Sequence, residues 1–235
     1  MLYSLFSKPL QSRSVPQPLP DFASLEVSAR KAEFFAYLQP IVAAVSSDVV
    51  EERVFVLETR ARVAAGKGLT GKQRARVTAL VDRYRVDAEG DAPIETVLSQ
   101  LAERVDTIPT SLVLVQGATE SGWGTSRFAV EGNNLFGQRC YDTGCGLAPA
   151  GRTNPSFNVK AFASVEDSVR SYVHNINTHS QYIEFRRLRS AQRERGEPLN
   201  GVVLAATLSQ YSERRFAYVR DIKALIAQNG LAPHD

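Results

Sequence analysis

Cysteine, histidine and tryptophan are scarce in this chain of 235 residues, which has two cysteines, three histidines and one tryptophan. So few Cys and His side chains leave little material for a zinc site, which needs a full set of such ligands. His174 and His179 lie in one predicted helix, but not at the i,i+4 spacing that would place both on one face. We therefore expect neither a metal ion nor a cofactor.

Long apolar runs and a strong excess of one charge are also absent. No run of about 18 apolar residues occurs, so the sequence predicts no membrane span. The formal net charge is +3, without the strong basic stripe typical of nucleic-acid-binding domains, so we expect no nucleic-acid partner. With 43% apolar residues the chain can bury a core, and its length suits one large domain or one domain with a helical extension.

A secretory leader is not evident in the first ten residues, MLYSLFSKPL. A leader has basic residues followed by about 7–15 apolar residues. Here Ser4, Ser7, Lys8 and Pro9 interrupt the apolar run. Either the leader is missing from this sequence, or export follows another route, or the protein stays inside the cell.

Residues 25–106 carry a helical pattern of apolar residues. Pro40 is predicted to kink or split the first amphipathic run, because proline removes a backbone donor inside a helix. Ser47 is predicted to cap a second helix, and Thr70 with Gln73 is predicted to form the capping box of a third. The helices predicted in this region cover 29–45, 47–65, 71–85 and 93–105.

A buried helix is predicted next, because the residues from Leu112 to Ala118 are apolar nearly all round. Gly117 shares a face with Glu120 at the end of this helix, and it leaves room either for a ligand or for another helix. Over 138–162, glycines, prolines and an alternating segment predict a small β-hairpin with a long loop. The helices predicted after it cover 164–178, 180–194, 200–209 and 213–229, and the arginine-rich part of the second is predicted to face solvent or to attract an anionic polymer.

The most informative stretch is TESGWGTSRFA over 119–129, which is followed by EGNNLFG over 131–137. A single carboxylate, Glu120, is followed at once by glycines, the lone Trp123 and a pair of asparagines. These residue types suit a site that cleaves sugars. A partly buried acid holds its proton near neutral pH, small residues let a polysaccharide approach the backbone, and an aromatic ring offers an apolar face to a sugar.

The two segments resemble the signature of the glucosaminidases that cleave bacterial peptidoglycan, and more closely the Bax-like branch of that family. The resemblance covers about 107–229 and implies a mainly α, lysozyme-like α+β domain with a small β-hairpin, preceded by a helical extension. We accordingly predict a flexible N-terminal segment over 1–24, a helical extension over 25–106 and a catalytic domain over 107–235. The resemblance continues in GQRC at 137–140, GCGL at 144–147, FASVEDSV at 162–169, Tyr172, NINTH at 175–179 and Tyr211-Ser212.

The resemblance places the catalytic general acid at Glu120; the alternative is a helix-end glutamate that pairs with Arg127. Many relatives carry a second acidic residue on the hairpin strand, where this chain has Asn158. Three accounts compete. The N-acetyl oxygen of the substrate acts as nucleophile and Asn158 orients it, or Asp142 acts as the base, or the protein is a weak enzyme or a binder.

Three further residues are predicted to bind substrate. The resemblance implies that Tyr211 lines the cleft opposite the acid; the alternative is a Tyr packed under the hairpin. Trp123 either stacks on a sugar or fills the core behind the cleft. Asn134 either contacts substrate amides or, with Asn133, fixes the turn after the acid helix through side-chain bonds to the backbone.

Cys140 and Cys145 bracket a short segment with a glycine that can close a small loop. We expect a disulfide between them, and the alternative is two free thiols in a turn. A disulfide fits an oxidising periplasm, and the family reading requires access to the cell wall. We therefore expect the protein in the periplasm or cell envelope.

The sequence thus predicts a peptidoglycan hydrolase of the endo-β-N-acetylglucosaminidase type, which binds peptidoglycan glycan strands and acts as a monomer. A lytic transglycosylase is an alternative, because that reaction also needs only one acid. A catalytically silent module that binds the cell wall is a second alternative, which the residue at Asn158 favours.

Overall fold

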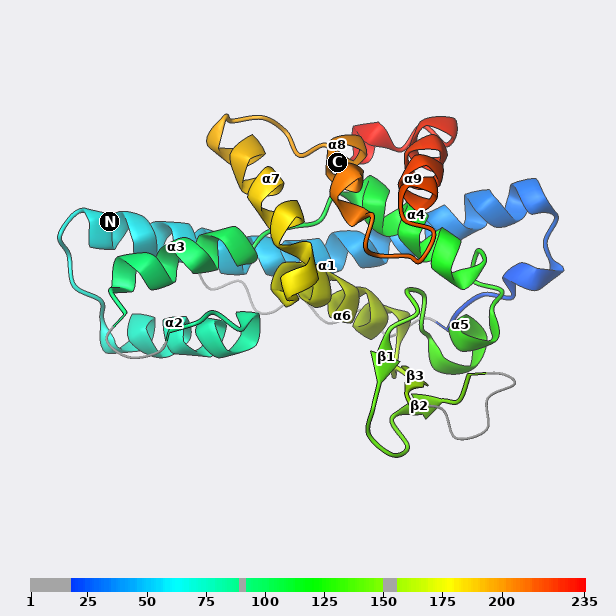
Figure 1. Ribbon diagram of the computed structural model, residues 1–235, viewed down its shortest axis with the longest axis horizontal. Coiled ribbons are helices and arrows are strands. Elements are labelled where there is room, and N and C mark those ends of the chain that lie inside the picture. Colours follow the sequence, from blue (N-terminus) through cyan, green and yellow to red (C-terminus); the bar gives the residue numbers. More distant parts are fainter. Residues whose placement is uncertain (1–17, 89–91, 150–155) are drawn as a thin grey trace, which may run out of the picture.

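The computed structural model describes residues 18–88, 92–149 and 156–235, and the prediction of a flexible N-terminal segment falls largely outside them. The described chain is mostly helical, with one small sheet, as predicted. Figure 1 shows the first helix running along the molecule, with the sheet below its N-terminal half and α2 and α3 at its C-terminal end. The α-helices are α1 Val27–Ala64, α2 Gly71–Tyr84, α3 Ile94–Arg104, α4 Thr110–Ser121, α5 Arg127–Gly132, α6 Val165–Thr178, α7 Ile183–Glu194, α8 Gly201–Leu204 and α9 Phe216–Gln228.

Helix α1 continues through Pro40, so the predicted split and the predicted cap at Ser47 were wrong. Proline deprives the helix of one backbone hydrogen bond. The loss is offset because one long stripe of α1 is buried against α3, α4 and α6. The buried residues of this stripe are Phe34, Leu38, Val42, Val45, Val49, Val56 and Thr59.

The predicted caps of the other helices are largely confirmed. Thr70 and Gln73 form a complete capping box at the start of α2. The Ser164 side chain accepts a hydrogen bond from the Asp167 amide and begins α6, as predicted. Asn200 caps α8, although the predicted helix over 200–209 divides into α8 and the short 3₁₀ helix η3, Ala205–Leu208. The last helix begins at Phe216, three residues later than predicted.

The predicted β-hairpin is a three-stranded antiparallel sheet of β1 Arg139–Cys140, β2 Gly146–Leu147 and β3 Asn158–Lys160. The last strand in sequence, β3, lies between the other two. Gly146 has to be glycine here, because a Cβ atom would lie 2.0 Å from the Val159 carbonyl oxygen. Cys140 and Cys145 form the predicted disulfide across the turn between β1 and β2. Part of the predicted loop, 150–155, lies outside the described residues.

Two hydrophobic clusters share α1. The first surrounds α4, with side chains from the first half of α1, from α6 and from α9. The second lies between the C-terminal half of α1 and helices α2 and α3. Gly117 of α4 lies against α1, since a Cβ atom there would be 3.0 Å from Leu38 Cδ2. The space that the sequence left open beside Gly117 is therefore occupied by another helix. The boundary predicted near residue 106 stays a prediction.

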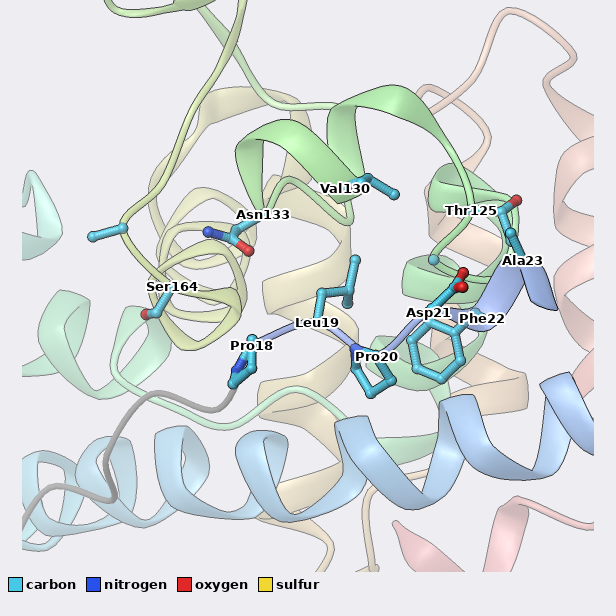
Figure 2. Close-up of a pocket in the computed structure, with 12 residues that line it drawn as sticks. Pro18, Leu19, Pro20, Asp21, Phe22, Ala23, Thr125, Val130, Asn133 and Ser164 are labelled. Atoms are coloured by element: carbon cyan, nitrogen blue, oxygen red, sulfur yellow. The ribbon is translucent and has the colours of Figure 1, made fainter. Parts of the chain in front are cut away.

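The segment from Pro18 to Ala23 packs on the loop that follows α4 (Figure 2). Phe22 is buried, and its ring packs directly on Gly124. A Cβ atom on Gly124 would lie 2.5 Å from Phe22 Cδ2, which leaves no room for a side chain there. Phe22 also contacts Phe34 of α1, with ring centroids 5.5 Å apart. A cavity of about 520 Å³ lies beside this segment, and Asp21 is the one charged residue among the described residues that line it.

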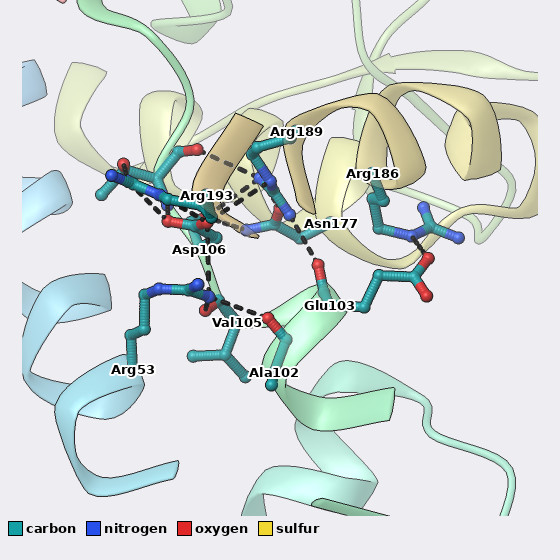
Figure 3. A network of polar contacts seen from close by, with 10 residues as sticks. Arg53, Ala102, Glu103, Val105, Asp106, Asn177, Arg186, Arg189 and Arg193 are labelled. Atoms are coloured by element: carbon teal, nitrogen blue, oxygen red, sulfur yellow. Dashed lines mark hydrogen bonds and ion pairs between the residues drawn. The ribbon is translucent and has the colours of Figure 1, made fainter. Parts of the chain in front are cut away.

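A buried polar network joins α1, the end of α3 and α7 (Figure 3). Asp106 is 1% exposed and accepts two hydrogen bonds from Arg193, at 2.9 and 3.1 Å. Arg53 of α1 contacts the same carboxylate at 3.3 Å. Arg189 is fully buried and donates to the carbonyl oxygens of Glu103, Asp106 and Thr107. The predicted solvated face of α7 was therefore wrong for its buried arginines, which are Arg186 and Arg189.

Within the described residues, the longest helix, α1, does not have the sustained apolar stretch that crossing a bilayer requires, and neither does any other.

Candidate active site

Glu120 lies in the last turn of α4, a helix whose residues from Ser111 to Ala118 are all buried. Gly122 ends this helix in the left-handed conformation, with φ of 58°. A non-glycine residue rarely adopts that backbone conformation, so the glycine fixes where α4 stops. The buried helix thereby holds the Glu120 carboxyl, which is half-buried, at the edge of the main core.

A polar cavity of about 520 Å³ opens at the Glu120 carboxyl. Its sides come from the turn before β1, from α6 and η2 (Ser180–Tyr182), and from the loop between η3 and α9. Glu120 and Glu213 are the two carboxylates among the described residues that line it, and Arg139 and Arg215 are the two cations. The remaining lining residues are Phe136, Gly137, Gln138, Asn175, Gln181, Tyr182, Ser209, Gln210, Tyr211 and Ser212.

A chain of hydrogen bonds runs to Glu120 from the core. The Tyr172 hydroxyl donates to Gln116 Oε1, and Gln116 Nε2 donates to the Tyr218 hydroxyl at 2.9 Å. Because the Tyr218 oxygen accepts from the amide, its proton is free to be donated to the Glu120 carboxylate, to which it is hydrogen-bonded. Gln116, Tyr172 and Tyr218 are buried. The acid therefore has a fixed hydrogen-bond partner on its protein side.

Burial raises the pKa of Glu120 above its ordinary value, because the ionised form loses hydration. The hydrogen bond from Tyr218 stabilises the ionised form and opposes part of this shift. Burial also raises the pKa of Tyr211 and Tyr172 well above the usual range, so both keep their protons. Glu120 thus lies among hydroxyl groups that stay neutral, and burial favours its protonated form.

Aromatic rings form one side of the site. The Tyr211 ring stacks on that of Tyr218, with centroids 5.6 Å apart and planes 8° apart. The Phe136 ring stacks on that of Tyr172 at 4.3 Å. The Tyr211 hydroxyl donates to the Phe136 carbonyl oxygen at 3.2 Å, which connects the loop after η3 to the turn before β1. These contacts keep the cavity open beside Glu120.

The structure brings two of the five predicted catalytic and binding residues together, since Glu120 and Tyr211 line one cavity. Asn134 is 2% exposed and donates to the carbonyl oxygens of Gln138 and Lys160, so its amide holds the turn in place. Neither Asn134 nor Asn158 is among the residues that line the cavity; Asn158 pairs with Cys140 in the sheet.

Trp123 is not among the residues that line the cavity, and it packs against α1. Its ring meets Phe34 and Phe35 edge-to-face, with centroids 6.0 and 5.3 Å away. The Lys31 ammonium stands 5.2 Å from the ring centroid. These neighbours correspond to the second of the two interpretations of Trp123, a ring that fills the core behind the cleft.

Sequence reasoning missed Gln116, Tyr218 and Glu213. Gln116 precedes Glu120 by one helical turn, so it offered a usable signal: a polar residue in a helix that is otherwise apolar. Glu213 lies on the loop after η3 and Tyr218 lies in α9. Both are far from Glu120 in the sequence, and only the folded chain brings them to it. Among the described residues, no cluster of three or more His, Cys, Asp or Glu side chains offers a metal site.

Two comparisons identify relatives of this chain. The family model described as "Mannosyl-glycoprotein endo-beta-N-acetylglucosaminidase" (Glucosaminidase) matches residues 96–231. The chain is also 32% identical over 203 residues to "Protein bax" of Escherichia coli (strain K12), and the match covers 85% of this chain and 70% of that protein. No solved structure matches the chain. The chain therefore belongs to the glucosaminidase family, in its Bax-like branch.

Proposed function

We propose that this chain is a peptidoglycan hydrolase that cleaves β-1,4 glycosidic bonds next to N-acetylglucosamine, with Glu120 as general acid. The description of its family names an endo-β-N-acetylglucosaminidase, which is a glycosidase. The observation that carries the proposal is the half-buried carboxyl of Glu120 at a polar cavity, with its pKa raised by burial. A glycosidase needs such a protonated carboxyl beside the leaving oxygen.

In this mechanism Glu120 gives its proton to the glycosidic oxygen as the bond to the sugar C1 breaks. The bond from Tyr218 orients the carboxyl and leaves one of its oxygens for the substrate. Gln116 fixes the direction of the Tyr218 hydroxyl, because it donates to that oxygen. A carboxyl that is already held in the reactive orientation lowers the entropic cost of reaching the transition state.

The nucleophile in this proposal is the N-acetyl oxygen of the substrate itself. Glu120 is the half-buried carboxylate of the cavity, and the strand position that carries an acid in many relatives is Asn158, away from the lining. A substrate that supplies its own oxygen requires only one protein group to deliver the proton. After the leaving sugar departs, water attacks C1 and Glu120 takes up a proton again.

We further propose that the protein acts in the periplasm or cell envelope, as a monomer. The support for this location is the disulfide between Cys140 and Cys145, because such bonds persist in oxidising compartments. Its partner there is the glycan strand of peptidoglycan.

Digestion of purified peptidoglycan, followed by mass spectrometry of the soluble fragments, tests the reaction. The proposal expects fragments that end in a reducing N-acetylglucosamine. Fragments that end in 1,6-anhydromuramic acid identify a lytic transglycosylase instead. Cosedimentation with the cell wall without any release of fragments identifies a silent binding module, and Asn158→Glu then tests whether the missing strand acid is the reason.

Replacing Tyr218 by Phe is expected to move the alkaline limb of the pH–rate profile to higher pH. The rate falls as the pH rises through the pKa of Glu120, because the acid must be protonated. Tyr218 favours the ionised form, so its removal raises the pKa further. We also expect a loss of about tenfold in kcat, because the carboxyl is less well oriented.

Tyr141→Phe is the matched control, because Tyr141 is an exposed tyrosine in the cysteine loop and should leave the profile unchanged. An alkaline limb that stays in place or moves to lower pH in Tyr218→Phe would contradict the assigned hydrogen bond. The profiles are measured as release of reducing ends across a range of pH.

A further inference from the structure

The cavity at Glu120 has a second carboxylate that sequence reasoning did not identify. Glu213 lies on the loop between η3 and α9 and lines the same cavity. The two groups differ in their surroundings, because Glu120 is half-buried whereas Glu213 is exposed. Such a difference between two carboxylates in one site separates their chemical roles. Asp142, the acid of the cysteine loop, is not among the residues that line the cavity.

The loop that carries Glu213 is held on both sides of this residue. Before it, the Tyr211 hydroxyl bonds to the Phe136 carbonyl oxygen at 3.2 Å. After it, Arg214 pairs with Asp221 of α9 at 2.6 Å. The Arg215 amide also donates to the Ser212 carbonyl oxygen at 2.9 Å, which closes a turn around Glu213. The backbone around Glu213 is therefore held by contacts that reach both α9 and the turn before β1.

The backbone of this turn is strained. Arg215 has φ of 47°, in the left-handed region that side chains with a Cβ atom rarely adopt. Such a residue costs about 1–3 kcal/mol and persists where the surrounding contacts hold it, typically at functional sites. Arg215 itself lines the cavity beside Glu213. The strain thus occurs at the point where the loop turns its charged residues toward the cavity.

We propose that Glu213 binds the acetamido group of the sugar at the cleavage point, by accepting a hydrogen bond from its N–H. The negative charge of Glu213 then directs the acetamido oxygen toward C1 and stabilises the positive charge that forms on that group. This inference rests on the proposed function. It assigns to Glu213, on the loop before α9, the orienting role that the sequence had offered to Asn158, which does not line the cavity.

The proposed reaction forms one bond for each bond that it breaks. Glu120 transfers its proton to the glycosidic oxygen, the C1–O bond breaks, and its electron pair stays on the departing sugar. The acetamido oxygen uses a lone pair to bond to C1 and forms an oxazolinium ion, whose N–H is held by Glu213. Water then attacks C1 and gives a proton to Glu120, the C1 bond to the acetamido oxygen opens, and the product keeps the original anomeric configuration.

Two substitutions of Glu213 test this assignment. Glu213→Gln keeps an acceptor oxygen but removes the charge, so we expect kcat to fall by about tenfold, while Glu213→Ala removes both and is expected to lower kcat by about 100-fold. Binding of a stable thiazoline analogue of the oxazolinium, measured by calorimetry, should weaken in the same order. Circular dichroism and thermal melting establish that the variants are folded.

Glu58→Gln is the control, because it neutralises an exposed carboxylate of α1 that does not line the cavity, and it should have native kcat and thiazoline affinity. Native kcat in Glu213→Ala would overturn the assignment, and so would a product of inverted configuration in the first turnover, read by NMR. If the native chain cleaves peptidoglycan and Glu120→Gln does not, either of these two results rejects only the role of Glu213 and leaves the proposed function standing. If the native chain does not cleave peptidoglycan at all, the proposed function itself fails.

Discussion

Glu120→Gln should lower the release of reducing ends from purified peptidoglycan by about 10²–10⁴-fold, the usual contribution of a general acid. The amide has nearly the shape of the carboxylic acid but no proton to give to the leaving oxygen. The buried partners Gln116 and Tyr218 remain in place around it. Cosedimentation with the cell wall should therefore be retained while cleavage is lost, which separates chemistry from binding.

Stability measurements separate this loss from unfolding. The pKa of Glu120 is raised in the folded protein, so its ionised form is disfavoured there and its contribution to stability is lost as the pH rises through that value. A neutral glutamine avoids this penalty, and the variant should be at least as stable as the native chain at alkaline pH. Glu131→Gln, which removes an exposed carboxylate of the same motif, is the control and should cleave normally. Native activity in Glu120→Gln would remove Glu120 from the mechanism.

Asp106→Asn should lower the free energy of unfolding by about 3–5 kcal/mol, the usual cost of removing one partner from a buried ion pair. The substitution leaves Arg189 fully buried and Arg53 and Arg193 without their carboxylate. The buried Arg189 guanidinium cannot regain water without opening the junction of α1, α3 and α7, whereas Arg193 is partly exposed. Denaturant unfolding at neutral pH, followed by circular dichroism, measures the loss.

The loss of stability caused by Asp106→Asn should be larger at neutral pH than in acid. Burial disfavours the ionised form of Asp106, but Arg189, Arg193 and Arg53 together outweigh burial and lower its pKa. The stabilisation is present above the pKa of an unfolded Asp and is lost as the pH falls through the folded value. The difference between native and variant should therefore shrink in acid. Glu184→Gln, which breaks an exposed pair with Arg187, should change stability by less than about 1 kcal/mol. An Asp106→Asn chain as stable as this control would contradict the role of the network.

Local signals in the sequence were sufficient for several helix caps and for the place of Glu120 at the end of a buried helix. The capping box of Thr70 and Gln73 and the cap at Ser164 depend on residues only three positions apart. Glu120 was singled out because its motif is continuous; it lines a cavity, and its role as general acid stays a prediction. Pro40 was misjudged because packing along the whole of α1 decides whether the helix continues. Arg189 was misjudged because its partners, Asp106 and Asn177, come from distant segments.

The parts of the site that the sequence did not reveal are those that need tertiary contacts. Tyr218 reaches Glu120 only because α9 packs against α4. Glu213 depends on a loop that is held to the turn before β1 through Tyr211. The order of the strands was missed for the same reason. β3 pairs with both earlier strands, and no pattern of neighbouring residues in the sequence indicates that it lies between them.

The sharing of α1 between two clusters affects how the protein can be shortened. A fragment trimmed to residues 107–235 would lose Phe34, Leu38 and Val42, and with them the surface that covers Gly117, three positions before the acid. Expression of that fragment should give an aggregating product, because an apolar face of α4 would meet solvent. The smallest soluble fragment that keeps Glu120 in place must therefore include the N-terminal half of α1, although that half belongs to the predicted helical extension over 25–106.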